Sequence, residues 1–145
     1  MRSETVGSHA IEDYLKTIYL VQQDEGRVTT SALARRLGVA AASVTNMVKR
    51  LAEMNLVRHA PYHGVKLLPA GEKIALEVVR HHRLLELYLA EALGMPWDQV
   101  HAEADRLEHV ISEDLEERMA AALGQPTMDP HGHPIPSRDL TVLER

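Results

Sequence analysis

The 145-residue chain contains no cysteine, so disulfide bonds, thiolate zinc fingers and cysteine nucleophiles are excluded. No apolar run approaches the roughly 18 residues that a membrane-spanning helix needs. The first residues lead into no apolar signal segment, and the chain has no internal repeat, glycine-rich phosphate loop or nucleophile motif. These absences predict a cytoplasmic protein in a reducing compartment, with no membrane partner.

The composition is that of an ordinary globular protein, with 45% hydrophobic and 26% charged residues. Its net charge of −5 hides a division along the chain. Residues 1–70 carry a net +3, whereas residues 71–145 carry −8 and six of the nine histidines. Residues 27–66 alone hold seven basic side chains against Glu53 and reach +6. The first half therefore suits a polyanion and the second half a cation.

The first half has the pattern of a helix-turn-helix. Apolar residues at helical spacing predict a first helix over 9–23. Thr29 or Thr30 can cap a short second helix that stops at Gly38, and a third helix follows over 43–51. Two short helices around a glycine-containing turn are typical of this motif.

A wing and a helical region follow. Two β-compatible runs, 56–59 and 65–68, surround a proline- and glycine-containing turn and predict a hairpin. Two longer helices are predicted over 72–93 and 97–123, before an irregular tail. The expected fold is mainly α: a winged helix-turn-helix of three helices and a two-stranded wing, then an all-helical domain. The expected domain ranges are 1–70 and 71–145.

Polar and basic side chains on the predicted third helix and wing could contact DNA. Asn46 can pair with adenine, small residues such as Ala42 suit thymine methyl groups, and basic residues suit phosphates. The same polar residues could instead be helix caps or ordinary surface residues. The candidate DNA-binding residues are Arg35, Arg36, Ala42, Ser43, Thr45, Asn46, Lys49, Arg50, Arg58 and Lys66.

Histidines and carboxylates recur on the two long helices. His101, Asp105, Glu108 and His109 stand at i, i+4, i+7 and i+8 and share one face at the border of the apolar stripe. On the preceding helix, an i, i+4 pair flanks the apolar stripe in the same way. That pair is His82 and Glu86. Packing of the two stripes would bring all these groups together, and a partly buried cluster of this kind needs a cation. The alternative is a set of surface pairs.

Three other histidines of the second half have different interpretations. His81 lies within the apolar stripe, which indicates a packing role. His131 and His133 could bind a metal, but their glycine- and proline-containing surroundings favour a simple turn.

Several segments together resemble the diphtheria toxin repressor family of metal-dependent transcriptional regulators, which includes manganese-responsive members. They are IEDYLKTIY (11–19), SVT (43–45), HRLLE (82–86), VHAEADRLEH (100–109) and GHPIP (132–136). The resemblance covers roughly residues 8–137. It implies a winged helix-turn-helix and a helical domain that binds metal and forms a homodimer.

The resemblance also implies two metal sites. The matching positions of the primary site are Asp13, Asp105, Glu108 and His109, and those of the ancillary site are His82, Glu86 and His101. Iron-responsive relatives carry Met and Cys where this chain has Asp13 and Asp105, so the primary set is all oxygen and imidazole. This harder set favours Mn²⁺, with Fe²⁺ as the other candidate and Zn²⁺, Co²⁺, Ni²⁺ or Cd²⁺ as substitutes in vitro.

Two departures from the family pattern affect these sites. Manganese-responsive relatives carry an acidic ligand where this chain has Lys16, so we expect separate sites rather than a bridged two-metal cluster. Longer relatives add ancillary ligands from an SH3-like domain, whereas this sequence ends at Arg145. The expectation is that water or an anion completes the ancillary site, unless the chain is a truncated form.

The predicted function is a metal-dependent repressor of metal-uptake genes that binds double-stranded operator DNA as a dimer. It is not expected to be an enzyme. Two alternatives stay open: a winged-helix regulator that senses an organic ligand, and a metal-dependent hydrolase whose cluster holds an activated water.

Overall fold

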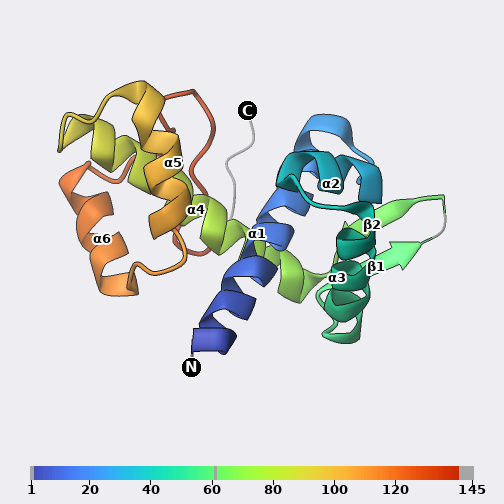
Figure 1. The fold of residues 1–145 in the computed structure, drawn as a ribbon. Coiled ribbons are helices and arrows are strands. Elements are labelled where there is room, and N and C mark those ends of the chain that lie inside the picture. Colours follow the sequence, from blue (N-terminus) through green and yellow to red (C-terminus); the bar gives the residue numbers. More distant parts are fainter. Residues whose placement is uncertain (1, 61, 141–145) are drawn as a thin grey trace. The chain divides into compact units, whose positions relative to one another are not determined.

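A computed structural model describes residues 2–60 and 62–140 of the chain (Figure 1). The chain divides into two units, Met1–Ala75 and Leu76–Arg145. Three helices and a two-stranded sheet belong to the first unit, and two helices belong to the second. Helix α4 (Pro69–Glu91) starts in the first unit and continues in the second. Within the described ranges, no helix is long and apolar enough to cross a membrane.

Helix α1 (Arg2–Glu25) uses its apolar face as the sequence predicts. Leu15, Ile18 and Val21 are fully buried, and the helix is followed by Gly26 in the left-handed region, at φ 78°. The predicted start at residue 9 is too late, because the helix begins ahead of the first residue of the apolar pattern. An apolar pattern of helical spacing occurs only in those turns of a helix that pack against the core, so it does not reveal an unpacked N-terminal extension.

The helix-turn-helix is formed by α2 (Thr30–Leu37) and α3 (Ala41–Glu53). Thr29 Oγ1 accepts a hydrogen bond from the Ala32 N–H at 3.0 Å and so caps α2. Gly38 ends α2 at φ 67°, a conformation that a side chain disfavours. Local capping rules therefore predicted both ends of this helix correctly.

The wing consists of β1 (Val57–Ala60) and β2 (Gly64–Leu67), which pair antiparallel with Val57 opposite Leu67. Its second strand is anchored by a backbone hydrogen bond from Val65 N–H to Val28 O at 2.8 Å. Gly64 makes this approach possible, because a Cβ atom there would lie 2.4 Å from the same carbonyl oxygen. The hairpin is confirmed, and with it the winged helix-turn-helix.

The predicted single helix over 97–123 is wrong, because this segment forms two helices, α5 (Trp97–Leu107) and α6 (Glu113–Ala122). Ser112 begins the second helix: its Oγ accepts from the Leu115 N–H at 3.1 Å, and acidic residues fill the first turn. The apolar spacing continues through the break, which is why periodicity alone missed it. His109 consequently lies in the turn between the two helices rather than on the predicted helix face.

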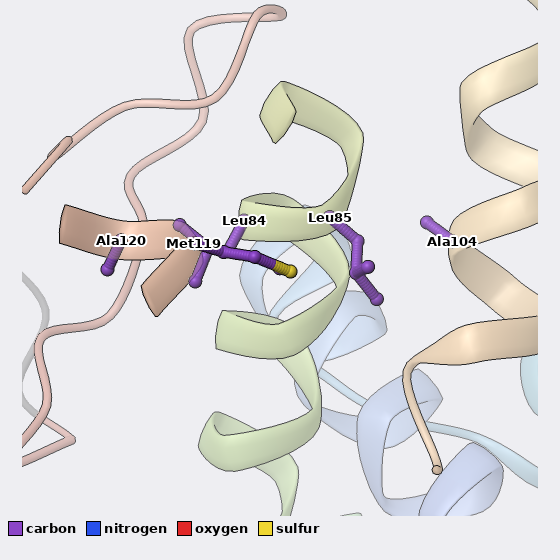
Figure 2. Packing of buried hydrophobic residues seen from close by; sticks show 5 residues of the cluster. All are labelled: Leu84, Leu85, Ala104, Met119 and Ala120. Carbon is purple, nitrogen blue, oxygen red and sulfur yellow. The ribbon is translucent and has the colours of Figure 1, made fainter. Parts of the chain in front are cut away.

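Helices α5 and α6 meet the second-unit part of α4 in one core (Figure 2). Leu84 and Leu85 of α4 lie between Met119 and Ala120 of α6 on one side and Ala104 of α5 on the other. Each of these residues is at most 4% exposed. The core fixes the faces of α4 and α5 that carry the candidate metal ligands.

Candidate metal centre and DNA-binding surface

The ancillary set predicted from the sequence comes together between α4 and α5. His82 Nε2 lies 3.4 Å from Glu86 Oε1 and 3.2 Å from His101 Nδ1. His101 Nδ1 lies 3.3 Å from Glu86 Oε2, and the two imidazole rings pack edge to face at 4.8 Å. All three residues offer a ligand atom within 4.8 Å of one another. His82 and Glu86 are buried, and His101 forms the exposed side.

Three residues of the predicted primary set also converge. Glu108, which is only 1% exposed, lies with Oε1 2.6 Å from His82 Nδ1 and with Oε2 3.3 Å from His109 Nε2. Asp105 Oδ1 lies 3.3 Å from His82 Nδ1. The fourth predicted residue, Asp13, is half-buried on α1 in the first unit. Within the second unit, His82 thus faces both sets through its two ring nitrogens.

The donor chemistry of this cluster fits a divalent transition-metal ion. Glu86 and Glu108 are buried carboxylates, which are costly to keep charged without a compensating cation. A neutral imidazole has one N–H, so neutral His82 can donate to only one of the groups on its two sides. Imidazole nitrogens combined with carboxylate oxygens are ligands of Mn²⁺, Fe²⁺ and Zn²⁺. The residues present therefore suit such an ion.

The charge of Glu86 responds to these neighbours. Burial alone would raise its pKa, but hydrogen bonding and charge from His82, together with His101, hold the pKa below its usual value of 4.5. Glu86 is consequently ionised at neutral pH, as a metal ligand must be.

A second polar network beside this cluster was not predicted. His81 is hydrogen-bonded through Nε2 to Glu116 Oε2 at 2.6 Å and through Nδ1 to Glu108 O at 3.0 Å. Arg80 donates from Nε to Glu116 Oε1 at 2.5 Å and from Nη1 to the Pro136 carbonyl at 2.9 Å. The packing role inferred for His81 is therefore incomplete, because its ring is also a hydrogen-bonded link between α4, α6 and the end of α5.

The pKa values of this network reflect its pairing. Burial lowers the pKa of His81, but the hydrogen bonds to Glu116 and to the Glu108 carbonyl outweigh that effect and raise it above 6.5. Burial raises the pKa of Glu116, but His81 and Arg80 outweigh it and lower the value below 4.5. Both groups are thus stabilised in their charged forms.

The candidate DNA-binding residues are solvent-exposed in the first unit. On α3, only Val44, Val48 and Leu51 are buried, so the polar and basic side chains of that helix face outward. Thr45 uses its hydroxyl to donate to Ala41 O at 3.1 Å, and Arg36 is paired with Asp24. The exposed candidates are Arg35, Arg36, Ala42, Ser43, Thr45, Asn46, Lys49, Arg50, Arg58 and Lys66.

The wing carries an unfavourable pair of like charges. Arg58 and Lys66 are directly opposite each other in the strand register, and both are exposed. Like charges in this position destabilise a hairpin. Such a pair is useful where a polyanion lies against it, as DNA phosphates would.

Comparisons with known proteins agree with this architecture. Residues 8–65 match the family model "Iron dependent repressor, N-terminal DNA binding domain", and residues 68–137 match "Iron dependent repressor, metal binding and dimerisation domain". These matches, together with the winged helix-turn-helix, place the chain in the class of proteins that the family models describe as iron-dependent repressors. The chain belongs to the diphtheria toxin repressor family, which confirms the resemblance seen in the sequence.

The curated relatives of the chain include an iron-dependent repressor and a diphtheria toxin repressor. The chain is 40% identical over 125 residues to the iron-dependent repressor IdeR of Mycobacterium tuberculosis. The matched segment covers 86% of this chain and 54% of that relative. It is 38% identical over 126 residues to the diphtheria toxin repressor of Corynebacterium efficiens, with the same two shares. The chain therefore spans about half the length of the curated relatives it matches.

Solved structures show the same fold. A manganese-dependent transcriptional repressor in complex with manganese matches with a TM-score of 0.87 and 44% identity, over 93% of this chain and 62% of that one. The manganese regulator SloR matches with a TM-score of 0.83 and 35% identity, over 93% of this chain and 63% of that one. Iron- and manganese-responsive proteins are thus both among the relatives.

Proposed function

We propose that this chain is a metal-dependent transcriptional repressor of metal-uptake genes, which binds double-stranded operator DNA as a homodimer when metal is bound. The observation that carries the proposal is the convergence of three imidazoles and three carboxylates in the second unit of a chain whose first unit is a winged helix-turn-helix. Membership of the iron-dependent repressor class supports the same function. In this proposal, residues 1–70 bind DNA and residues 71–145 bind metal and dimerise.

Two groups of residues would hold the metal. The primary site consists of Asp13, Asp105, Glu108 and His109, and the ancillary site of His82, Glu86 and His101. The contact between Glu108 and His109, and the position of Asp105 and Glu108 beside the same His82 imidazole, support the first group. Asp13 is assigned from the family motif alone.

Manganese is the proposed regulatory metal, with Fe²⁺ as the alternative. The primary group offers only carboxylate and imidazole ligands, a set harder than one containing thiolate or thioether. Zn²⁺, Co²⁺, Ni²⁺ and Cd²⁺ would occupy the same ligands in vitro, because later metals generally bind such sites at least as tightly.

The mechanism depends on carboxylate repulsion. When bound, the metal supplies a compact divalent positive charge shared by the primary ligands. Without that charge, Asp13, Asp105 and Glu108 repel one another, and the DNA-binding domain is not held in one orientation. With it, Asp13 couples α1 to the second domain, and the two recognition helices of a dimer can match successive half-sites. Metal and DNA must then strengthen each other's binding by the same factor.

The family model that matches residues 68–137 supports the homodimer. This model is described as a dimerisation domain. Light scattering should give twice the mass of 16.2 kDa for the purified chain.

The decisive experiment selects an operator from random duplexes and then measures its affinity for the chain. We expect tight binding with saturating Mn²⁺ and a loss of at least about tenfold, or 1.4 kcal/mol, with chelator. Parallel titrations with Fe²⁺ and Zn²⁺ show which metal ion activates operator binding at the lowest concentration. Equal operator affinity with chelator and with Mn²⁺ would contradict metal dependence, and metal-dependent ester hydrolysis would instead favour an enzyme.

A further inference from the structure

Two candidate ligands of the primary group lie where helix α5 ends. Leu107 is the last residue of the helix, Glu108 is its C-cap, and His109 follows directly. Residues 108–112 form a turn between α5 and α6, which is the ligand turn of this site. The last carbonyl groups of an α-helix have no N–H partner within the helix and need one from elsewhere. The way in which this turn is held therefore sets the directions of both ligand side chains.

The ring of His81 on α4 supplies such a partner. Its Nδ1 lies 3.0 Å from the Glu108 carbonyl oxygen, so the ring caps the C-terminal end of α5. Histidine suits this position, because its N–H can donate to the last carbonyls of a helix. Since the carbonyl and the carboxylate belong to the same residue, this contact also fixes the backbone from which the Glu108 side chain projects.

The His81 ring is itself held from α6. Its Nε2 lies 2.6 Å from Glu116 Oε2, and the other oxygen of that carboxylate accepts from Arg80 Nε at 2.5 Å. The side chains of these three residues are at most 18% exposed. Because α4 lies between α5 and α6 (Figure 2), the contacts run from α6 across α4 to the ligand turn.

We infer that His81 and Glu116 are positioning residues of the primary metal site, which hold the ligand turn so that Glu108 and His109 present their ligand atoms in a fixed arrangement. Both act through the turn, since neither belongs to the primary or the ancillary group. The inference rests on the proposed function, because it takes Glu108 and His109 as metal ligands. Replacement of residues that orient metal ligands from outside typically lowers metal affinity about 10–100-fold.

The ancillary group depends on other contacts. Glu86 and His101 lie against each other and against His82 Nε2. The part of α4 that carries Glu86 is anchored in the core by its leucines, so its position does not depend on the His81 ring. The effect of His81 should therefore be confined to the primary group, whereas a general loss of structure would weaken both groups.

The test measures Mn²⁺ affinity by isothermal titration calorimetry in two variants of the full chain. His101→Ala leaves the primary group complete, and Glu108→Gln leaves the ancillary group complete. Addition of His81→Leu or Glu116→Gln to His101→Ala should weaken Mn²⁺ binding by about tenfold or more. The same additions to Glu108→Gln should leave the Mn²⁺ affinity unchanged.

The two substitutions separate positioning from charge. His81→Leu removes a group that is cationic when protonated, and Glu116→Gln removes an anion, so charge alone would shift the Mn²⁺ affinity in opposite directions. Loss of positioning weakens binding in both. Each variant keeps a hydrogen-bond acceptor beside Arg80, either Glu116 itself or the amide oxygen of the introduced glutamine. The fold is therefore retained, and circular dichroism with chelator verifies this.

Glu117→Gln is the matched control, because Glu117 is the next residue of α6 and is paired with exposed Arg138. It should leave the Mn²⁺ affinity unchanged in both variants.

Three results would overturn the inference: opposite shifts for His81→Leu and Glu116→Gln, no loss of affinity with either in His101→Ala, or an equal loss in Glu108→Gln. Absence of Mn²⁺ binding by His101→Ala alone would also overturn it, because the primary group would then not bind metal. Since the readout is metal affinity, absence of operator binding would contradict the proposed function and leave this inference standing.

Discussion

The imidazole of His82 lies with Nδ1 2.6 Å from the buried carboxylate of Glu108, while its Nε2 faces Glu86 and His101. His82 was assigned from the family resemblance to the ancillary group and Glu108 to the primary group. Because these two side chains are in contact, a change in the protonation or charge of one of them changes the electrostatic environment of the other. The two groups of candidate ligands are therefore physically coupled within the second unit.

Glu108→Gln tests the primary group directly. The change keeps the side-chain volume but removes the negative charge, so Mn²⁺ affinity should fall by at least the ~10–100-fold that loss of an outer ligand partner costs. The metal response of operator binding should be lost, as it should in His109→Ala, while circular dichroism shows an unchanged helix content. Glu103→Gln is the matched control, because Glu103 lies on α5, which ends just before Glu108, and is paired with exposed Arg106. An unchanged metal response in Glu108→Gln would refute this assignment.

His82→Gln tests the coupling between the groups. Since His82 contacts both groups, we expect this variant to weaken two metal-binding events in calorimetry, whereas His101→Ala should weaken one. The measurement is an isothermal titration of each variant with Mn²⁺ at the same pH. If His82→Gln and His101→Ala give the same single loss, the primary group does not depend on His82.

Local sequence rules predicted the parts of the fold that local interactions determine. Thr29 and Gly38 delimit α2 because a hydroxyl cap and a left-handed glycine act within a few residues. The break before α6 was missed although Ser112 is an equally good cap, because the apolar spacing of Leu107 and Leu115 continues across it. Leu115 is in fact 45% exposed, so that spacing did not correspond to one buried face.

The candidate site was predictable only as far as helix faces determine it. The border position of Glu108 correctly indicated a residue near the core, but its near-complete burial depends on packing against other elements. His81 was inferred to be a packing residue because its partner, Glu116, lies 35 positions away on α6. Periodicity within one helix cannot identify a hydrogen-bond partner on another.

Glu116→Ala should destabilise the metal-free protein by about 3–5 kcal/mol, because it leaves buried Arg80 without its carboxylate partner. The lowered pKa of Glu116 stabilises the fold above about pH 4.5, and that contribution is lost as the pH falls through the folded value. The raised pKa of His81 stabilises it below about pH 6.5, and that contribution is lost as the pH rises through the folded value.

Urea unfolding with chelator between pH 4 and pH 8 measures both contributions. The stability difference between wild type and His81→Gln should be largest between about pH 4.5 and 6.5 and should shrink toward pH 8. Glu117→Ala is a suitable control, since Glu117 neighbours Glu116 on α6 but is more exposed and pairs with exposed Arg138. A difference that grows toward pH 8 would contradict a raised pKa for His81.

Arg58 and Lys66 on the wing should contribute to DNA affinity through electrostatic attraction to the phosphates, which does not depend on the base sequence of the DNA. Arg58→Ala and Lys66→Ala should each weaken binding to the selected operator and to random duplex alike, and each should reduce the slope of log affinity against log salt by about 1. Asn46→Ala should instead reduce affinity by about 1–3 kcal/mol for the operator only, if its amide reads an adenine. Anisotropy titrations with saturating Mn²⁺ at several salt concentrations separate the two effects.

Lys73→Ala is the control, because it changes an exposed lysine outside the wing and should leave the salt slope of the affinity unchanged. If the salt slope is also unchanged in both wing variants, the wing does not contact the phosphates.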